Sequence, residues 1–236
     1  MKKSSRSLLI IGLLVFVASA LIPVNSFADV DVYGEGAYTE SDLVVYIYAD
    51  INSPTELRSA GVKLTYETAA LTVDTAEKND SDWFLGSESY MDPDMSTAGE
   101  VVIILGKLDT GDATAGVSGD RVLLGKVRFN RTGSSIPFSP TLDLALGKVD
   151  PYANFVDTAE PTANVLDDTG VNFGTIIIAK RGDANADGNI TMADAMFVKH
   201  MFQSGLPYVC YADANSDDGI SMADAMLIKH IFQTGG

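Results

Sequence analysis

The sequence predicts an all-β sandwich followed by a small all-α module, and three features support this division. Residues 29–180 contain short apolar segments separated by Gly, Asp, Ser and Pro, which is typical of a sandwich of short strands. Residues 181–236 contain an internal repeat, in which an acidic loop is followed by an apolar pattern of helical period. Residues 1–28 have the pattern of a signal peptide. We therefore expect two domains in the mature chain.

The strand prediction depends on alternation of apolar and polar residues. In "GVKLTYE" the apolar residues Val62, Leu64 and Tyr66 fall on one face, which indicates a strand covered on one side. The segment "TLDLALGKV" alternates in the same way through its leucines. The expected strands lie at residues 42–51, 61–67, 100–108, 121–130, 141–149 and 171–180.

The first 28 residues indicate export. Lys2, Lys3 and Arg6 form a basic segment, Leu8 to Val17 are apolar, and "SFA" before Asp29 resembles a signal-peptidase site. An uncleaved membrane anchor is the alternative, but the apolar stretch is at the short end of the roughly 17–25 residues that a spanning helix needs. We expect a secreted protein, extracellular or at the cell surface, with no membrane span in its mature form.

The net charge limits the classes of partner that the chain can bind, and the cysteine count limits its disulfides. The formal net charge is −16, and it becomes −19 after residues 1–28 are removed, because they carry three basic residues and no acidic one. So acidic a chain repels nucleic acid and anionic lipid, and its carboxylates favour a hard cation. Cys210 is the only cysteine, so the chain has no intramolecular disulfide. We expect a buried thiol, with pairing between chains as the alternative.

Two acidic dodecamers, "DANADGNITMAD" at 183–194 and "DANSDDGISMAD" at 213–224, have the spacing of EF-hand calcium loops. Such loops supply side-chain oxygens from positions 1, 3 and 5, a carbonyl from 7, a water-mediated contact at 9 and a carboxylate at 12. The alternative is a solvated acidic turn, which tandem repetition disfavours. We expect two Ca²⁺ ions, whose binding stabilises the folded loops. The predicted ligands are Asp183, Asn185, Asp187, Asn189, Thr191 and Asp194, and Asp213, Asn215, Asp217, Gly219, Ser221 and Asp224.

The loops depart from an EF-hand in three ways. Position 12 is Asp instead of Glu, and the β-like segment before the first loop leaves no room for an entering helix. In the second loop Asp218 occupies position 6, where the sharp turn favours Gly, and Gly219 has moved to position 7. We therefore expect the second site to be the weaker one.

Each loop is expected to lead directly into a helix. The hydroxyls of Thr191 and Ser221 are placed to cap these helices. Ile190 and Ile220 are expected to point inward and to join the loops through a short β-bridge. The apolar set of each helix is wide, so one part is expected to form the helix–helix core and the remainder to stay exposed as a docking face.

The tandem loop–helix repeat resembles a type I dockerin over Asp183 to about Thr234. In that family each loop binds Ca²⁺ and the folded pair binds a cohesin domain. The resemblance implies partner contacts, in two orientations related by a pseudo-twofold axis, at Met192, Ala193, Lys199, His200, Met222, Ala223, Lys229 and His230. The methionines differ from the Ser or Thr common in cellulosomal dockerins, which weakens the inference of a cellulosomal partner. Alternatively, the lysines only complement the helix dipoles, and the repeated pairs only record a duplication.

Residues 29–180 resemble a cohesin, a jelly-roll sandwich related to carbohydrate-binding modules, through "GKVRFN" and "TLDLALGKVDPYANFVDT". The resemblance implies that one chain carries both halves of a docking pair. Only "RG" separates the last strand from the first loop, which makes docking within one chain awkward. We expect head-to-tail association between copies, or capture of other exported cohesin- or dockerin-bearing proteins.

The functional hypothesis is a non-catalytic adaptor that assembles exported proteins through calcium-dependent cohesin–dockerin contacts, linked to extracellular polysaccharide degradation. A carbohydrate-binding module is the first alternative, with Trp83, Phe84 and Tyr90 as sugar-stacking candidates unless they plug the sandwich. A dockerin-bearing glycoside hydrolase is the second, with Asp92 and Asp94 as an acidic pair. No acidic pair stands out and both histidines occupy equivalent helix positions, so we expect no enzyme activity.

Overall fold

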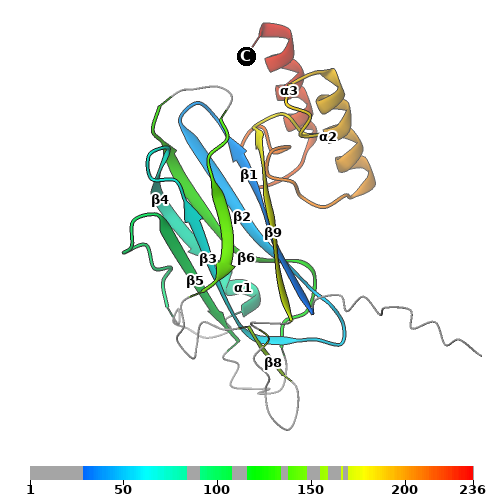
Figure 1. Cartoon of the computed structure of the whole chain (residues 1–236). Helices are drawn as coiled ribbons and strands as arrows, with labels where there is room; N and C mark the ends of the chain where they lie inside the picture. Colours follow the sequence, from blue (N-terminus) through cyan, green and yellow to red (C-terminus); the bar gives the residue numbers. More distant parts are fainter. Residues whose placement is uncertain are drawn as a thin grey trace, which may run out of the picture.

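The computed structural model describes residues 29–83, 91–107, 116–133, 138–147, 155–158, 166 and 170–235. Its elements are β1 (Val30–Tyr38), β2 (Asp42–Ile51), β3 (Leu57–Tyr66), β4 (Leu71–Lys78), α1 (Asp80–Trp83), β5 (Glu100–Gly106), β6 (Gly119–Arg131), β7 (Leu142–Leu146), β8 (Val156–Asp157), β9 (Val171–Lys180), α2 (Met192–Ser204) and α3 (Met222–Thr234). Figure 1 shows the strands in two layers, with α2 and α3 beyond one end. None of the helices among these residues has the length and apolar character of a membrane span.

The strands form the predicted sandwich. One sheet has the order β4-β6-β2-β1-β9, in which only β1 and β9 run parallel. The other has the order β5-β3-β7, and β8 pairs with β3. The apolar faces of both sheets meet in one core, in which Phe129 and Phe155 are fully buried. Below, "sandwich" denotes residues 29–180 and "C-terminal module" residues 181–236.

The predicted strands are present, with shifted ends in most cases. β2 and β9 begin and end at the predicted residues, and Val62 and Leu64 of β3 are fully buried as the alternation required. The tails of two predicted segments, 108 and 148–149, lie outside the described residues. β1, β4 and the two-residue β8 were not predicted, nor was the four-residue helix α1.

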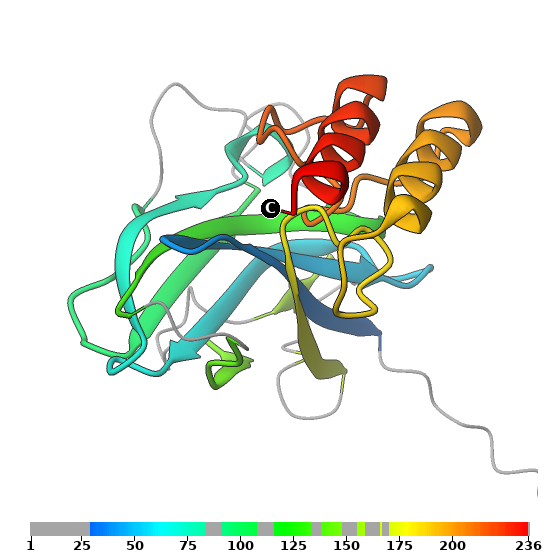
Figure 2. The ribbon, with the colours of Figure 1, turned by 90° about the horizontal axis from the view of Figure 1, so that it is seen from above.

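Strand β2 is buried on both faces. Leu43, Val45 and Ile47 point into the sandwich core, whereas Tyr46 and Tyr48 lie on the outer face of the sheet. Both tyrosines are nevertheless at most 8% exposed, because the C-terminal module covers them. Figure 2 shows from above that α2 and α3 lie side by side on the outer side of this sheet, with the segment that joins them next to the strands.

The junction between the sandwich and the C-terminal module is short and hydrogen-bonded. β9 pairs with β1 as far as Lys180. The backbone N–H of Arg181 donates to the carbonyl of Tyr38 at 2.9 Å, and that of Gly182 donates to the carbonyl of Tyr211 at 2.8 Å. The strand therefore passes directly into the first acidic loop without a flexible linker.

Gly125 on β6 provides a test of the packing between strands. A Cβ at this position would lie 2.6 Å from the backbone oxygen of Glu77 and 2.6 Å from Cδ1 of Ile103. We expect Gly125→Ala to lower the free energy of unfolding by about 1–3 kcal/mol in urea titrations, because the strands must move apart. Gly106→Ala is the matched control, since no atom lies within 4 Å of its added Cβ. Equal unfolding midpoints for the two variants would contradict this packing.

Candidate functional site

The two acidic loops share a pair of hydrogen bonds at their first position. In the first loop the carboxylate of Asp183 accepts bonds from the backbone N–H groups of Asp187 at 3.1 Å and Gly188 at 2.8 Å. In the second loop Asp213 accepts the equivalent bonds at 3.2 and 2.9 Å. Each first carboxylate therefore organises the turn of its own loop.

The twelfth position closes each loop and starts its helix. Asp194 accepts bonds from the backbone N–H of Thr191 at 2.7 Å and of Asn185 at 3.2 Å. The hydroxyl of Thr191 in turn accepts from the backbone N–H of Ala193, which completes a capping box. The second loop repeats this arrangement with Ser221 and Asp224. The predicted capping roles of both hydroxyls are confirmed.

Four carboxylates are buried in these loops. The exposed fractions are 1% for Asp183, 0% for Asp194, 2% for Asp213 and 0% for Asp224. Among the described residues none of the four forms an ion pair with a basic side chain. Burial raises the pKa of Asp183 and of Asp213 above the usual range, against the hydrogen bonds that lower it. A cation held by these carboxylates would offset the cost of their burial.

Among the remaining predicted ligands, the side chains at positions 3 and 5 of each loop are exposed, whereas Thr191, Gly219 and Ser221 are half-buried. The amide of Asn185 donates to Asp187 at 2.9 Å, and Asn215 makes the equivalent bond to Asp217. Within the described residues, no three carboxylate, thiol or imidazole groups converge closely enough to form a metal site by themselves. A calcium loop does not require such convergence, because amide and backbone carbonyl oxygens supply part of the shell. The carboxylate and amide oxygens of these loops are of the chemical kind that a hard cation takes as ligands.

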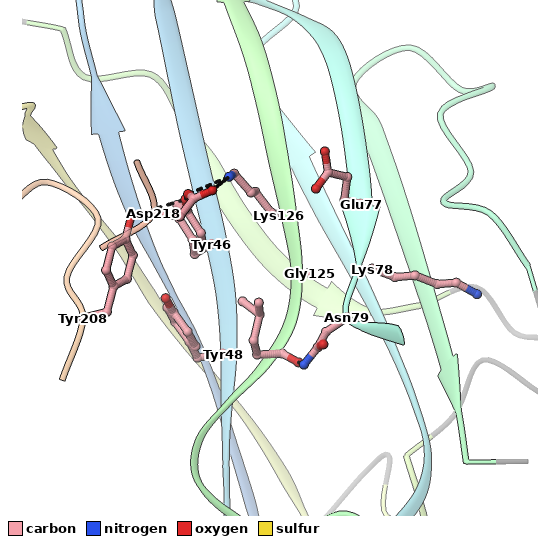
Figure 3. A pocket seen from close by; sticks show the side chains of 10 residues that line it. Tyr46, Tyr48, Glu77, Lys78, Asn79, Gly125, Lys126, Tyr208 and Asp218 are labelled. Carbon is pink, nitrogen blue, oxygen red and sulfur yellow. Dashed lines mark hydrogen bonds and ion pairs between the residues drawn. The ribbon is translucent and has the colours of Figure 1, made fainter. Parts of the chain in front are cut away.

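The turn at position 6 is left-handed in both loops, as the sequence predicted. Gly188 has φ 92° and Asp218 has φ 60°. The side chain of Asp218 has a role that was not predicted. It accepts hydrogen bonds from Lys126 at 2.9 Å and from the hydroxyl of Tyr46 at 2.5 Å, both on the sandwich (Figure 3). The bond from Lys126, followed by that from Tyr46, lowers the pKa of the Asp218 carboxyl.

The expected β-bridge between the loops was wrong. Ile190 and Ile220 pack against the small core of the C-terminal module, but among the described residues no backbone bridge joins them. The connection lies elsewhere, in the bond from the Gly182 N–H to the Tyr211 carbonyl. That bond links the residues just before the two loops, and the two isoleucines pack against the same small core.

The helices divide their apolar residues as predicted. Val198, Met201 and Ile228 are buried in the core of the C-terminal module. Outside this core α2 and α3 border an open groove of about 340 Å³, which we call the helix groove. Its lining residues are Met192, Ala195, Met196, Lys199, Met222, Ala225, Met226 and Lys229.

All eight predicted partner-contact residues are exposed, and four of them line the helix groove. Lys199 and Lys229 lie before the last turns of their helices, which contain no basic residue. The alternative role of these lysines as complements to the helix dipoles is therefore not supported. His200 and His230 lie beside them on the surface.

The structure does not support the other candidate sites. Trp83 is fully buried, so its ring cannot stack on a sugar, and Phe84 and Tyr90 lie outside the described residues. Asp92 and Asp94 are both exposed, beside β5. A cavity of about 370 Å³ opens where the second loop meets the sandwich, but its tyrosines Tyr46 and Tyr48 are too buried to offer a stacking surface (Figure 3).

The C-terminal module is a tandem of two acidic loops, each followed by a helix, and its sequence matches a known family model. Residues 181–233 match the model of the dockerin type I domain, a family of calcium-binding domains, which confirms the resemblance of this segment. None of the curated proteins that were compared matches the chain.

Several solved cohesin structures are similar to the sandwich. A type I cohesin–dockerin complex from Clostridium thermocellum has a TM-score of 0.45 and 18% identity, over 65% of this chain and 97% of that chain. The sixth cohesin of scaffoldin B from Acetivibrio cellulolyticus, in complex with a Cel5 dockerin, has a TM-score of 0.44 and 18% identity, over 63% and 96%. A non-cellulosomal cohesin from Archaeoglobus fulgidus has a TM-score of 0.34 and 17% identity, over 64% and 87%.

The buried twelfth carboxylate has a structural role that can be tested without metal. We expect Asp194→Ala, measured in chelator, to destabilise the C-terminal module by about 1–3 kcal/mol, because the N–H groups of Thr191 and Asn185 lose their acceptor. Asp187→Ala in the same loop is the control, since that carboxylate is exposed. Helical circular dichroism during urea unfolding measures both. Equal losses in the two variants would show that burial of Asp194 is unimportant.

Proposed function

We propose that the chain is an exported, non-catalytic adaptor, divided into residues 29–180 and 181–236, whose C-terminal module docks onto cohesin-bearing proteins when its loops hold Ca²⁺. The observation that carries this proposal is the burial of four carboxylates without ion-pair partners, in the loops and first turns of two helices that share an open apolar groove. The signal-like residues 1–28 support export. Association with extracellular polysaccharide degradation is part of the same proposal, and the dockerin match supports it.

Each loop would hold one cation through residues at equivalent positions. Asp183 and Asp194 in the first loop, and Asp213 and Asp224 in the second, supply buried carboxylates. The side chains at positions 3 and 5 and the backbone carbonyls of Asn189 and Gly219 would complete the oxygen shell. When bound, the cation supplies positive charge that neutralises these carboxylates. The twelfth carboxylates also organise the helix caps, so cation binding stabilises the helices that form the groove.

The helix groove supports docking through its chemistry and its position. Met196 and Met226 are 67% and 63% exposed, and flexible thioether side chains suit an adaptable contact surface. The internal repeat places equivalent residues of α2 and α3 along the groove, and this equivalence supports two binding orientations. The C-terminal module contacts its own sandwich through the second loop and the segment before it, and not through the groove. The groove therefore stays available to another chain.

The sandwich would be the second docking partner. Its β5-β3-β7 sheet lies opposite the face that contacts the C-terminal module, and the partly exposed ion pair of Lys63 and Glu100 crosses its strands. The groove of one chain and this sheet of the next can thus meet without displacing the contacts within either chain. This geometry supports head-to-tail association between copies, or capture of separate cohesin- and dockerin-bearing proteins.

Calcium dependence can be tested on the chain from Asp29 onward. At free Ca²⁺ a hundredfold above the dissociation constant, each occupied loop should add about 2.7 kcal/mol to the free energy of unfolding of the C-terminal module, relative to chelator. Asp183→Ala and Asp213→Ala should each remove one such increment, whereas Asp74→Ala, an exposed acid on β4, should remove none. Urea unfolding followed by helical circular dichroism measures this. Identical midpoints in calcium and chelator would refute the proposal.

Docking can be tested by replacing exposed apolar residues of the helix groove with acidic ones. The immobilised chain should retain cohesin-bearing exported proteins in Ca²⁺ and release them in chelator, and Met196→Glu with Met226→Glu should weaken retention roughly tenfold or more. The matched control is Ile177→Glu, since Ile177 on β9 is 52% exposed and lies outside the groove. Retention unaffected by the paired change excludes the groove as the docking surface. Binding to polysaccharide that persists in chelator supports the carbohydrate-binding alternative.

A further inference from the structure

A third apolar cluster lies between the sandwich and the C-terminal module. It consists of Ala37, Val44, Tyr46 and Tyr48 from β1 and β2, together with Cys210 from the segment before the second loop. Cys210 is 3% exposed, and burial raises the pKa of its thiol well above the usual range. The expectation of a buried thiol is confirmed. This thiol is buried by contact between the two parts of the chain, so it is accessible only when they separate.

One polar anchor lies at the edge of this cluster, on the second loop. The Asp218 carboxylate accepts two bonds from Lys126 of β6, at 2.9 and 3.2 Å, and one from Tyr46 of β2. The hydroxyl of Tyr208 donates to Asp213 at 3.1 Å and lies 3.3 Å from the hydroxyl of Tyr46. The sandwich thus reaches the first carboxylate of the second loop through two tyrosines.

A second polar anchor holds the segment before the loop. Arg121 of β6 forms a two-pronged ion pair with Glu35 of β1, at 2.7 and 2.6 Å, and its guanidinium lies 4.1 Å from the ring centre of Tyr48. The same guanidinium donates a hydrogen bond to the backbone carbonyl of Tyr208. Because Glu35 is only 8% exposed, this pair is largely removed from water where the C-terminal module covers it.

Among the described residues, position 6 of the first loop has no such anchor, although Arg181 before that loop pairs with Asp42 of β2 at 3.9 Å. Gly188 occupies the position of Asp218, and a Cβ built on it would meet no atom within 4 Å. An Asp with positive φ costs roughly 1 kcal/mol relative to Gly, so Asp218 is unfavourable for the turn alone. Its contacts with Tyr46 and Lys126 supply a reason for Asp at this position that the loop itself does not.

We propose that the Asp218 carboxylate, through its bonds to Tyr46 of β2 and Lys126 of β6, holds the C-terminal module in one orientation on its own sandwich. We call this contact the latch. The latch makes the two loops unequal. The sandwich supports the turn of the second loop at position 6 before any cation binds, whereas it contacts the first loop only through the residues that precede it. The latch does not rest on the docking proposal, because it involves neither the helix groove nor a partner chain.

Cys210 provides the direct measurement, since the chain has no other cysteine. In the chain from Asp29 onward, we expect Asp218→Gly to speed labelling of the thiol by a disulfide reagent such as DTNB roughly tenfold, the factor expected for loss of a charge-assisted hydrogen bond. Tyr46→Phe and Lys126→Met should speed it several-fold without altering the loop sequence. Labelling follows the open fraction when reclosing is fast.

Two matched control variants distinguish loss of the latch from a change in the loop backbone and from the loss of an ion pair elsewhere. Ser216→Gly removes a positive-φ side chain of the same loop, and Lys63→Met removes a comparable ion pair on the opposite sheet. Neither should change the labelling rate. Equal rates for the unaltered chain, Asp218→Gly and Tyr46→Phe overturn the latch. An increase with Asp218→Gly that Ser216→Gly reproduces also overturns it, because the loop backbone would then be responsible.

Amide hydrogen exchange in chelator tests the inequality of the loops. The N–H groups of Gly188 and Asp218 make equivalent bonds to Asp183 and Asp213, at 2.8 and 2.9 Å. We expect the Asp218 amide to exchange at least tenfold more slowly than that of Gly188 after correction for intrinsic rates. Tyr46→Phe should reduce this difference. Equal protection of both amides in the unaltered chain would contradict support of the second loop by the sandwich.

Discussion

The burial of charged carboxylates in two short loops is the constraint on which the C-terminal module depends. Asp194 and Asp224 are each inaccessible to solvent, yet each is also the residue that closes the capping box of the following helix. The same oxygens therefore set the start of the helix and form part of the candidate cation site. Any change in the electrostatic state of the loops acts directly on the helices and on the groove between them.

The sandwich adds a second constraint by fixing where the C-terminal module lies. The short junction at Arg181 limits the orientations that the module can adopt, and the cluster around Cys210 selects one of them. In this orientation the second loop faces β2 and β6, while the methionines of the groove remain exposed. The expectation that docking within one chain is awkward applies to the helix groove, whereas the second loop does contact its own sandwich.

Local patterns made much of the fold predictable. The bounds of β2 and β9, the two loops and their caps all follow from residues close together in sequence. β1 was missed because Gly34 and Gly36 weaken its strand pattern. These glycines have a reason in the fold, since a Cβ on Gly34 would lie 2.9 Å from Ile176 of the neighbouring β9.

The contact between sandwich and C-terminal module was not predictable from local patterns, because Tyr46 and Asp218 are 172 residues apart. Two signals in the sequence were nevertheless present. The apolar run from Leu43 to Ala49 is continuous, which is typical of a strand covered on both faces. Asp218 also occupies a loop position that favours Gly, and such a departure from local preference is common where a residue has another role.

Isothermal titration calorimetry tests most directly whether each acidic loop holds one Ca²⁺ ion, as we propose. The chain from Asp29 onward, stripped of divalent cations, should bind two Ca²⁺ ions per molecule with measurable heat. A titration without heat, or with fewer than one ion bound per chain, would contradict the account.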